Sequence, residues 1–149
     1  MTSAKIIYEL RDWINPRKLI PKTLSRNSCA IEFLKANPHL IDWNSLSLNS
    51  AAIFFLKENK EKINWTYFKF NKNCREITNT NSDDYFYENS YNNDYFIKII
   101  NGEISTEKID FTFISMNPNA IDYLKNNYNK IDWYAFSENP AIFIQKYEK

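Results

Sequence analysis

Apolar and polar residues along this chain follow a pattern that repeats every 22 residues. The segments 24–45 and 46–67 agree position by position when one is written above the other, and Trp43 and Trp65 lie 22 residues apart. A third copy covers 114–135, and a shortened copy follows it from Phe136. Self-similarity at a fixed period indicates a repeat architecture, because each copy needs its neighbours to bury its apolar face.

Each copy predicts two short helices. The Ser-x-Asn-Pro/Ser stretch, as at 115–118, supplies N-cap residues, and proline is tolerated at the first helical position. Apolar residues follow at helical spacing. We expect this helix to end after roughly ten residues, at Asn37, Asn59 or Asn127, because Asn tolerates the left-handed conformation. A shorter second helix then begins at an aromatic residue, and a side-chain oxygen just before it is expected to cap it. The expected caps are Asp42, Asn64, Asp110 and Asp132.

The repeats together predict an all-α fold, a short α-solenoid of tandem helix-turn-helix units of about 22 residues with one insertion. The chain, 1–149, is expected to form a single domain. Its parts are an N-terminal segment (1–23), two repeats (24–67), a degenerate repeat (68–113) with a Tyr/Asp-rich insertion at about 75–104, and one repeat with a truncated C-terminal cap (114–149).

The aligned apolar positions define the expected core of the repeats. Placing Trp13 at the tryptophan position of the first unit leaves about eight extra residues before Leu24. The core residues that we predict are Trp13, Ile31, Leu34, Trp43, Ile53, Leu56, Trp65, Phe111, Ile121, Leu124 and Trp133.

Composition excludes several classes of protein. With 44% hydrophobic and 25% charged residues the chain should fold. Its one glycine, Gly102, excludes the glycine-rich loops that hold nucleotide phosphates. A net charge of +1 gives no global attraction to nucleic acid or membranes. Cys29 and Cys74 form neither a metal-type pair nor a disulfide framework, so we expect buried thiols in a reducing compartment. Without a signal peptide or a long apolar run, the protein is expected inside cells or in a virion, neither secreted nor transmembrane.

One repeat string resembles a known family. The string is most complete from Ile114 to Trp133, and it resembles the Asn-Pro-x-Ala-Ile…Ile-Asp-Trp repeats in uncharacterised proteins of mimivirus-like giant DNA viruses. The opening residues 8–13 resemble the usual start of such arrays. The resemblance implies a viral source and an interaction role, as a minor virion component, a scaffold or an adaptor to host proteins, and it carries no catalytic residues. The chain departs from the pattern at Ser28 and Ser50, where proline is usual, and across 69–108.

Residues that could carry chemistry are sparse. His39 is the single histidine and lies between the two helices of one repeat, with no second histidine or cysteine in frame, so we expect a solvent-facing loop residue. Asp83 and Asp84 lack the glycine and glutamate spacing of a calcium loop. The expectation is therefore a protein that is not an enzyme, with no catalytic residue, no metal and no cofactor.

The insertion separates charge along the chain. Residues 75–104 hold six acidic and two basic residues, whereas the rest holds 17 basic and 12 acidic ones. Tyrosine and phenylalanine are enriched at interface cores, so one interpretation is a partner-binding segment and the other is a flexible surface excursion. The candidate partner-binding residues are Tyr85, Phe86, Tyr87, Tyr91, Tyr95, Asp83 and Asp84.

A basic stretch flanks the first repeat. It could contact phosphates, an acidic partner, or the acidic insertion of a neighbouring copy in head-to-tail self-association, and a solvated face is the ordinary alternative. Our leading hypothesis is a non-enzymatic protein–protein interaction or structural module with viral, host or self partners, and no membrane. The alternative is a nucleic-acid-binding protein that uses this basic patch. The patch consists of Arg11, Arg17, Lys18, Lys22 and Arg26.

Overall fold

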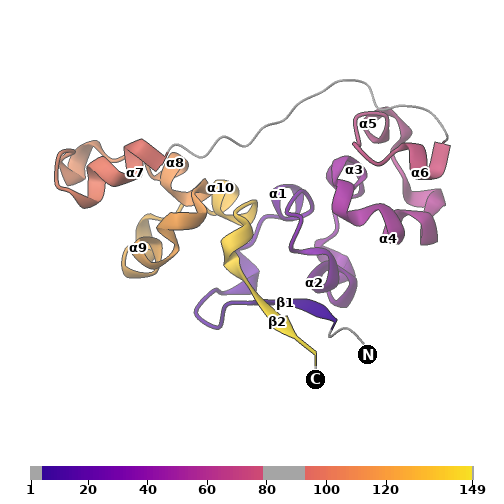
Figure 1. The fold of residues 1–149 in the computed structure, drawn as a ribbon, viewed down its shortest axis with the longest axis horizontal. Coiled ribbons are helices and arrows are strands. Elements are labelled where there is room, and N and C mark those ends of the chain that lie inside the picture. The colour runs from indigo at the N-terminus through magenta and orange to yellow at the C-terminus, as the bar shows by residue number, and fades with distance from the viewer. Residues whose placement is uncertain (1–4, 79–92, 149) are drawn as a thin grey trace.

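The computed structural model describes residues 5–78 and 93–148 as a series of short helices and one pair of strands (Figure 1). The α-helices are α1 (Pro21–Leu24), α2 (Ile31–Ala36), α3 (Trp43–Leu48), α4 (Ile53–Glu58), α5 (Trp65–Phe68), α6 (Arg75–Thr78), α7 (Asn93–Ile100), α8 (Phe111–Met116), α9 (Ile121–Asn126) and α10 (Trp133–Ser137). The strands are β1 (Ile6–Leu10) and β2 (Phe143–Tyr147). The 3-10 turns are Pro16–Lys18, Pro38–Leu40, Ser50–Ala52, Lys60–Lys62, Thr106–Lys108, Pro118–Ala120, Tyr128–Lys130 and Pro140–Ile142.

The predicted caps of the second helices are confirmed. The Asp42 carboxylate accepts a hydrogen bond from the backbone N–H of Ser45 at 2.7 Å, and the Asp132 carboxylate accepts one from Ala135 at 3.1 Å. Asn64 and Asp110 accept from the backbone two residues further on. These side chains satisfy N–H groups that have no partner within the helix. The Asp or Asn that recurs before each aromatic residue is therefore a helix cap.

The helices end at the predicted asparagines, but the predicted reason is wrong. Asn37, Asn59 and Asn127 have φ of −130°, −131° and −121°, outside the left-handed region. Each side-chain amide instead donates to the carbonyl four residues earlier, at 2.9 Å. The helices that they close are six residues long, shorter than the ten expected. A side-chain amide therefore satisfies a carbonyl at the helix terminus.

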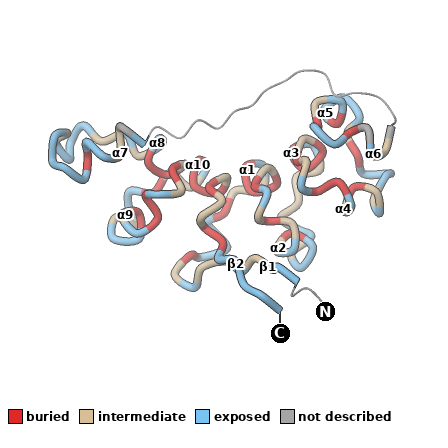
Figure 2. The backbone as a smooth tube through the Cα atoms, in the orientation of Figure 1, coloured by how far each residue is buried: buried red, intermediate tan, exposed pale blue. Residues whose placement is uncertain are grey.

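The helices form two rows, and their spatial order is not their order in the sequence. Figure 1 shows one row that runs α7, α8, α10, α1, α3, α5, with α9, α2 and α4 in a second row beside it. The C-terminal helix α10 therefore packs against the N-terminal helix α1, and α6 and α7 lie at opposite ends of the molecule (Figure 1). Buried residues run along the length of the molecule between exposed outer loops (Figure 2).

The core follows the repeat, with one exception. Five predicted residues are buried: Leu34, Ile53, Leu56, Ile121 and Leu124. Five more are half-buried against them: Trp13, Ile31, Trp43, Phe111 and Trp133. Trp65 is 51% exposed although it aligns with Trp43. It lies on α5, where the row ends, so no described helix covers it.

The prediction of an all-α solenoid is wrong. Strands β1 and β2, from the two ends of the chain, form an antiparallel sheet with Ile6 opposite Tyr147 and Leu10 opposite Phe143. The β-branched and aromatic residues of both segments favour strands. Residues 143–147 occupy the repeat position that α2, α4 and α9 hold in the other units, and the sheet lies between α9 and α2 (Figure 1). A mixed fold with many short helices and a two-stranded sheet replaces the predicted class.

The two ends of the chain together build one composite repeat unit. Helix α10 comes from the C-terminal end, and the turn Pro16–Lys18 with α1 comes from the N-terminal end. Pro16 and Pro21 lie 22 residues before Pro38 and Trp43, so residues 16–23 are in frame with the repeat. Trp13 is therefore out of frame, and it packs on Tyr128 and Phe136 with ring centroids 6.2 and 5.9 Å away. No extra residues interrupt the frame before Leu24.

The Asn59→Gly substitution distinguishes the two ways of ending a helix. Because the backbone is not left-handed and the amide donates to Phe55 O, glycine should lower the free energy of unfolding by about 1 kcal/mol. Urea unfolding followed by circular dichroism measures the change, with exposed Asn129→Gly as the control for backbone entropy. An increase in stability with Asn59→Gly would restore the left-handed explanation.

Candidate functional site

The surface between neighbouring units is the most regular site in the molecule. One buried asparagine follows each of α1, α3, α5, α8 and α10. In all of these units but that of Asn117, which donates to the Asn93 side-chain oxygen, the asparagine amide donates to two backbone carbonyls of the preceding unit. Asn49 donates to Ser25 O at 3.0 Å and Asn27 O at 3.1 Å. In the same way, Asn71 donates to Ser47 O and Asn49 O, and Asn139 donates to Ser115 O and Asn117 O. We call this set of contacts the asparagine ladder.

The oxygen of each ladder asparagine serves its own unit. It accepts from the backbone N–H two residues later, as Asn49 does from Ala51 at 3.0 Å and Asn27 from Cys29 at 3.0 Å. One side chain therefore closes its own turn and binds the unit before it. Among the described residues, no buried side-chain nitrogen or oxygen lacks a hydrogen-bond partner, which is what a buried polar network needs to be stabilising.

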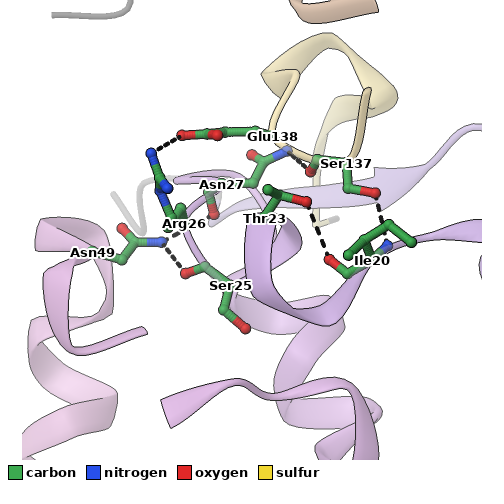
Figure 3. Close-up of polar contacts among 8 residues, drawn as sticks. All are labelled: Ile20, Thr23, Ser25, Arg26, Asn27, Asn49, Ser137 and Glu138. Atoms are coloured by element: carbon green, nitrogen blue, oxygen red, sulfur yellow. Dashed lines mark hydrogen bonds and ion pairs between the residues drawn. The ribbon is translucent and has the colours of Figure 1, made fainter. Parts of the chain in front are cut away.

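The asparagine ladder continues across the junction between the two ends of the chain (Figure 3). Asn27 donates to Ser137 O at 3.2 Å. It also donates to Asn139 O at 2.9 Å, so it makes the same contacts that Asn49 makes with Ser25 and Asn27. The order of the rungs in space is therefore Asn117, Asn139, Asn27, Asn49 and Asn71. Covalent continuity is not needed for two units to stack.

A serine rung runs parallel to the asparagine ladder. The Ser25 hydroxyl accepts from the backbone N–H of Asp42 at 2.9 Å, and Ser47 and Ser115 accept in the same way from the next unit. Ser137 accepts from Ile20 at 2.8 Å, so this rung also crosses the junction (Figure 3). In the unit that contains α7, no serine fills this role. The Tyr95 hydroxyl accepts instead from the backbone N–H of Asp110 at 2.7 Å.

Lysines stack on aromatic rings of the preceding unit with the same period. Lys62 lies 4.9 Å from the Trp43 ring centroid, and Lys130 lies 5.5 Å from that of Phe111. Across the junction, Lys18 lies 5.1 Å from the Trp133 ring centroid. Such contacts contribute about 0.5–1 kcal/mol each at exposed sites. They account for the Lys-Ile-Asp-Trp part of the repeat.

Most of the basic patch is engaged at the junction. The Arg11 guanidinium donates to Ala141 O at 2.6 Å, and its backbone N–H donates to Ile142 O. Arg26 forms an ion pair with Glu138 at 3.1 Å (Figure 3), and Lys18 stacks as described above. Arg17 and Lys22 are exposed. Three of the five predicted basic residues therefore hold the two ends of the chain together.

Most of the predicted partner-binding residues lie outside the described part of the chain. They are Tyr85, Phe86, Tyr87, Tyr91, Asp83 and Asp84. Tyr95 is described, and it is half-buried in α7, with its ring 6.5 Å from that of Phe113. Because its hydroxyl takes the place of the serine in the serine rung, Tyr95 contributes to the stacking of two units.

His39 and Cys29 are described residues of types that can carry chemistry. His39 is exposed in the turn Pro38–Leu40, where the sequence placed it. Burial raises the pKa of the Cys29 thiol, which lowers its thiolate fraction and its reactivity. In residues 5–78 and 93–148, no three His, Cys, Asp or Glu side chains lie close enough to hold a metal ion. Nor does any helix in these ranges have the length and apolar character to cross a bilayer.

No known protein family, curated protein or solved structure matches this chain.

Sequence reasoning identified the right residues for the stack but missed what they do. Asn27, Asn49 and Asn117 were interpreted as caps, and they do close their own turns. The amide contacts to the neighbouring unit were not predicted. The sequence did contain one signal of these contacts. Asparagine recurs at this position, although Ser, Thr or Asp could cap a helix equally well. The recurrence of asparagine is explained by a second requirement, which is a side-chain amide that can donate hydrogen bonds.

The junction can be tested in a protein cleaved between residues 85 and 86 at an inserted protease site. The two fragments should remain associated, and Asn27→Ala should raise their dissociation constant by about 100-fold, because it leaves Ser137 O and Asn139 O without the amide. Asn71→Ala, which removes a rung within one fragment, is the matched control and should leave the constant unchanged. Fluorescence anisotropy of a labelled fragment measures it. A larger effect of Asn71→Ala would contradict the spatial order.

Proposed function

We propose that this protein is a non-enzymatic protein–protein interaction or structural module. The observation that carries the proposal is the asparagine ladder, which engages the recurrent buried amides in stacking. The acids that recur with the repeat, such as Asp42 and Asp132, are engaged in helix capping. The repeated polar residues thus have structural roles. We therefore assign partner binding to the exposed surfaces of the units that the asparagine ladder holds together.

Two kinds of surface support an interaction role. Large side chains such as Phe54 and Tyr134 are exposed on the helices, and aromatic residues are enriched where proteins bind one another. The Tyr/Asp-rich insertion adds further aromatic residues among acids. We place the principal partner contact in this insertion, since it is the largest departure from the repeat.

The resemblance to repeats of mimivirus-like giant viruses sets the proposed context. We propose a viral protein that acts as a minor virion component, as a scaffold in infected cells or as an adaptor to a host protein. The alternative of nucleic-acid binding is weaker, because Arg11, Lys18 and Arg26 are engaged in intramolecular contacts. Arg17 and Lys22 remain, and two cations provide few phosphate contacts.

Affinity capture with the full-length protein tests the proposed function. We expect a protein partner to be enriched from infected cells or from purified particles. The variant with Tyr85, Phe86 and Tyr87 replaced by serine should reduce recovery of that partner by about tenfold, because aromatic anchors carry much of an interface's affinity. Quantitative mass spectrometry measures the recovery, and Tyr147→Ser, an exposed tyrosine on β2, is the matched control. Failure to recover any reproducible partner would refute the proposal.

A salt titration with duplex and single-stranded DNA tests the alternative. We expect no binding at low salt, because the basic patch is largely occupied within the molecule. Binding that weakens steeply as salt rises, and that is lost in the Arg17→Ala/Lys22→Ala double variant, would instead favour nucleic-acid binding. Electrophoretic mobility shift and anisotropy measure it.

A further inference from the structure

The junction joins two parts of the chain that are otherwise separate stacks. We call residues 5–78 the N-terminal part and residues 93–148 the C-terminal part. Strand β1 of the first pairs with β2 of the second, and Asn27 donates to two carbonyls of the C-terminal part. Arg26 forms an ion pair with Glu138, and their side chains are only 22% and 13% exposed. None of these contacts requires both parts to come from the same copy of the chain.

The junction also buries aromatic rings of both parts. Phe143 of the C-terminal part is 5% exposed, and its ring centroid lies 5.7 Å from that of Phe33 in the N-terminal part. Trp13 packs in the same way on the fully buried Phe136. A part without its complement would expose these rings to water, which is unfavourable. Each part therefore needs a complementary part, from its own copy or from another.

The places where the two parts are covalently connected lie far apart. Thr78 ends α6 and Asn93 begins α7, at opposite ends of the molecule (Figure 1). Between them the row runs through α8, α10, α1, α3 and α5, and each of these helices contacts the next. Packed helices lie about 8–10 Å apart, so these four steps alone cover roughly 32–40 Å.

The connection is short for this span. Fifteen Cα–Cα steps join Thr78 to Asn93. Fully extended, such a chain reaches about 50 Å, whereas its unconstrained root-mean-square length is about 20–23 Å. The effective concentration of one part at the other falls when a connection must reach beyond its unconstrained length. A second copy can therefore compete for the junction.

We propose that two copies of this chain exchange parts, so that the N-terminal part of one copy forms the junction with the C-terminal part of the other. Exchange of identical elements is a low-cost route to dimers, because every contact of the junction is retained. Two rows that lie side by side in opposite directions bring α6 of each copy close to its own α7, so both connections shorten. This inference goes beyond the proposed function, because its site is the junction and its partner is a second copy.

The length of the connection tests the exchange. The unchanged protein should form a dimer whose fraction rises with concentration. Deletion of residues 82–89 leaves seven Cα–Cα steps, which reach at most about 25 Å, so one copy can no longer close its own junction. This variant should be dimeric at every concentration, with unchanged circular dichroism. Insertion of six Gly/Ser residues between 85 and 86 is the matched control and should raise the dissociation constant of the dimer several-fold. Sedimentation velocity measures all three proteins.

Mixing two charge-reversal variants gives the decisive result. Arg26→Glu and Glu138→Arg each place like charges at the junction, both within one copy and between two copies of the same variant. An exchanged dimer with one copy of each variant restores both ion pairs, one of them with its charges reversed. The variants, unfolded in urea and refolded together, should therefore form a 1:1 dimer in preference to either homodimer. Native mass spectrometry distinguishes the three dimers by mass, and the double variant in one chain should behave like the unchanged protein.

Three outcomes would overturn the proposal. They are an unchanged protein that stays monomeric at every concentration, a folded monomer of the 82–89 deletion, and a refolded mixture that contains no 1:1 dimer. If the deletion variant does not fold, the mixing experiment decides alone. Capture of a different protein by the insertion depends on none of these results, so this proposal and the proposed function can fail separately.

Discussion

The donation of a buried asparagine amide to two backbone carbonyls of the preceding unit is the interaction on which the structure depends. The helices α1, α3, α5, α8 and α10 are four to six residues long, too short to be stable alone. Each amide fixes the distance and the register between two units, and a missing amide would remove a hydrogen-bond donor from two backbone carbonyls, such as Ser25 O and Asn27 O. Leu46 and Leu124 then bury their apolar side chains between units that the asparagine ladder has already aligned.

Because the ladder acts through space, the order of units need not follow the chain. Asn27 finds the carbonyls of Ser137 and Asn139, and the composite unit is completed by β1 and β2 and by the Arg26–Glu138 ion pair. This ties the basic N-terminal stretch to the fold. It also moves the ends of the row to α5 and α7, where exposed apolar residues remain.

Local features of the fold could be predicted from the sequence, and non-local ones could not. The caps at Asp42 and Asp132 follow from residue type and spacing, since both partners lie within three residues. The packing of α10 on α1 joins residues more than 100 positions apart, and no local pattern encodes it. Trp13 was misplaced because Asp-Trp resembles the repeat, although Pro21 holds the true position. The candidate site was predicted only in part, because the asparagines were assigned a cap and not a contact.

The distance between paired spin labels tests the spatial order of the units most directly. The Cys29→Ala/Cys74→Ala double variant provides a cysteine-free protein for labelling. Alanine is suitable at both positions because Ala51 and Ala52 occupy the equivalent positions one repeat away. Labels at exposed positions 22 and 134 report on α1 and α10, and labels at 66 and 98 report on α5 and α7. In dilute protein, double electron–electron resonance should give a short distance for the first pair and a long one for the second. The opposite result would mean that the units stack in chain order and would contradict the account.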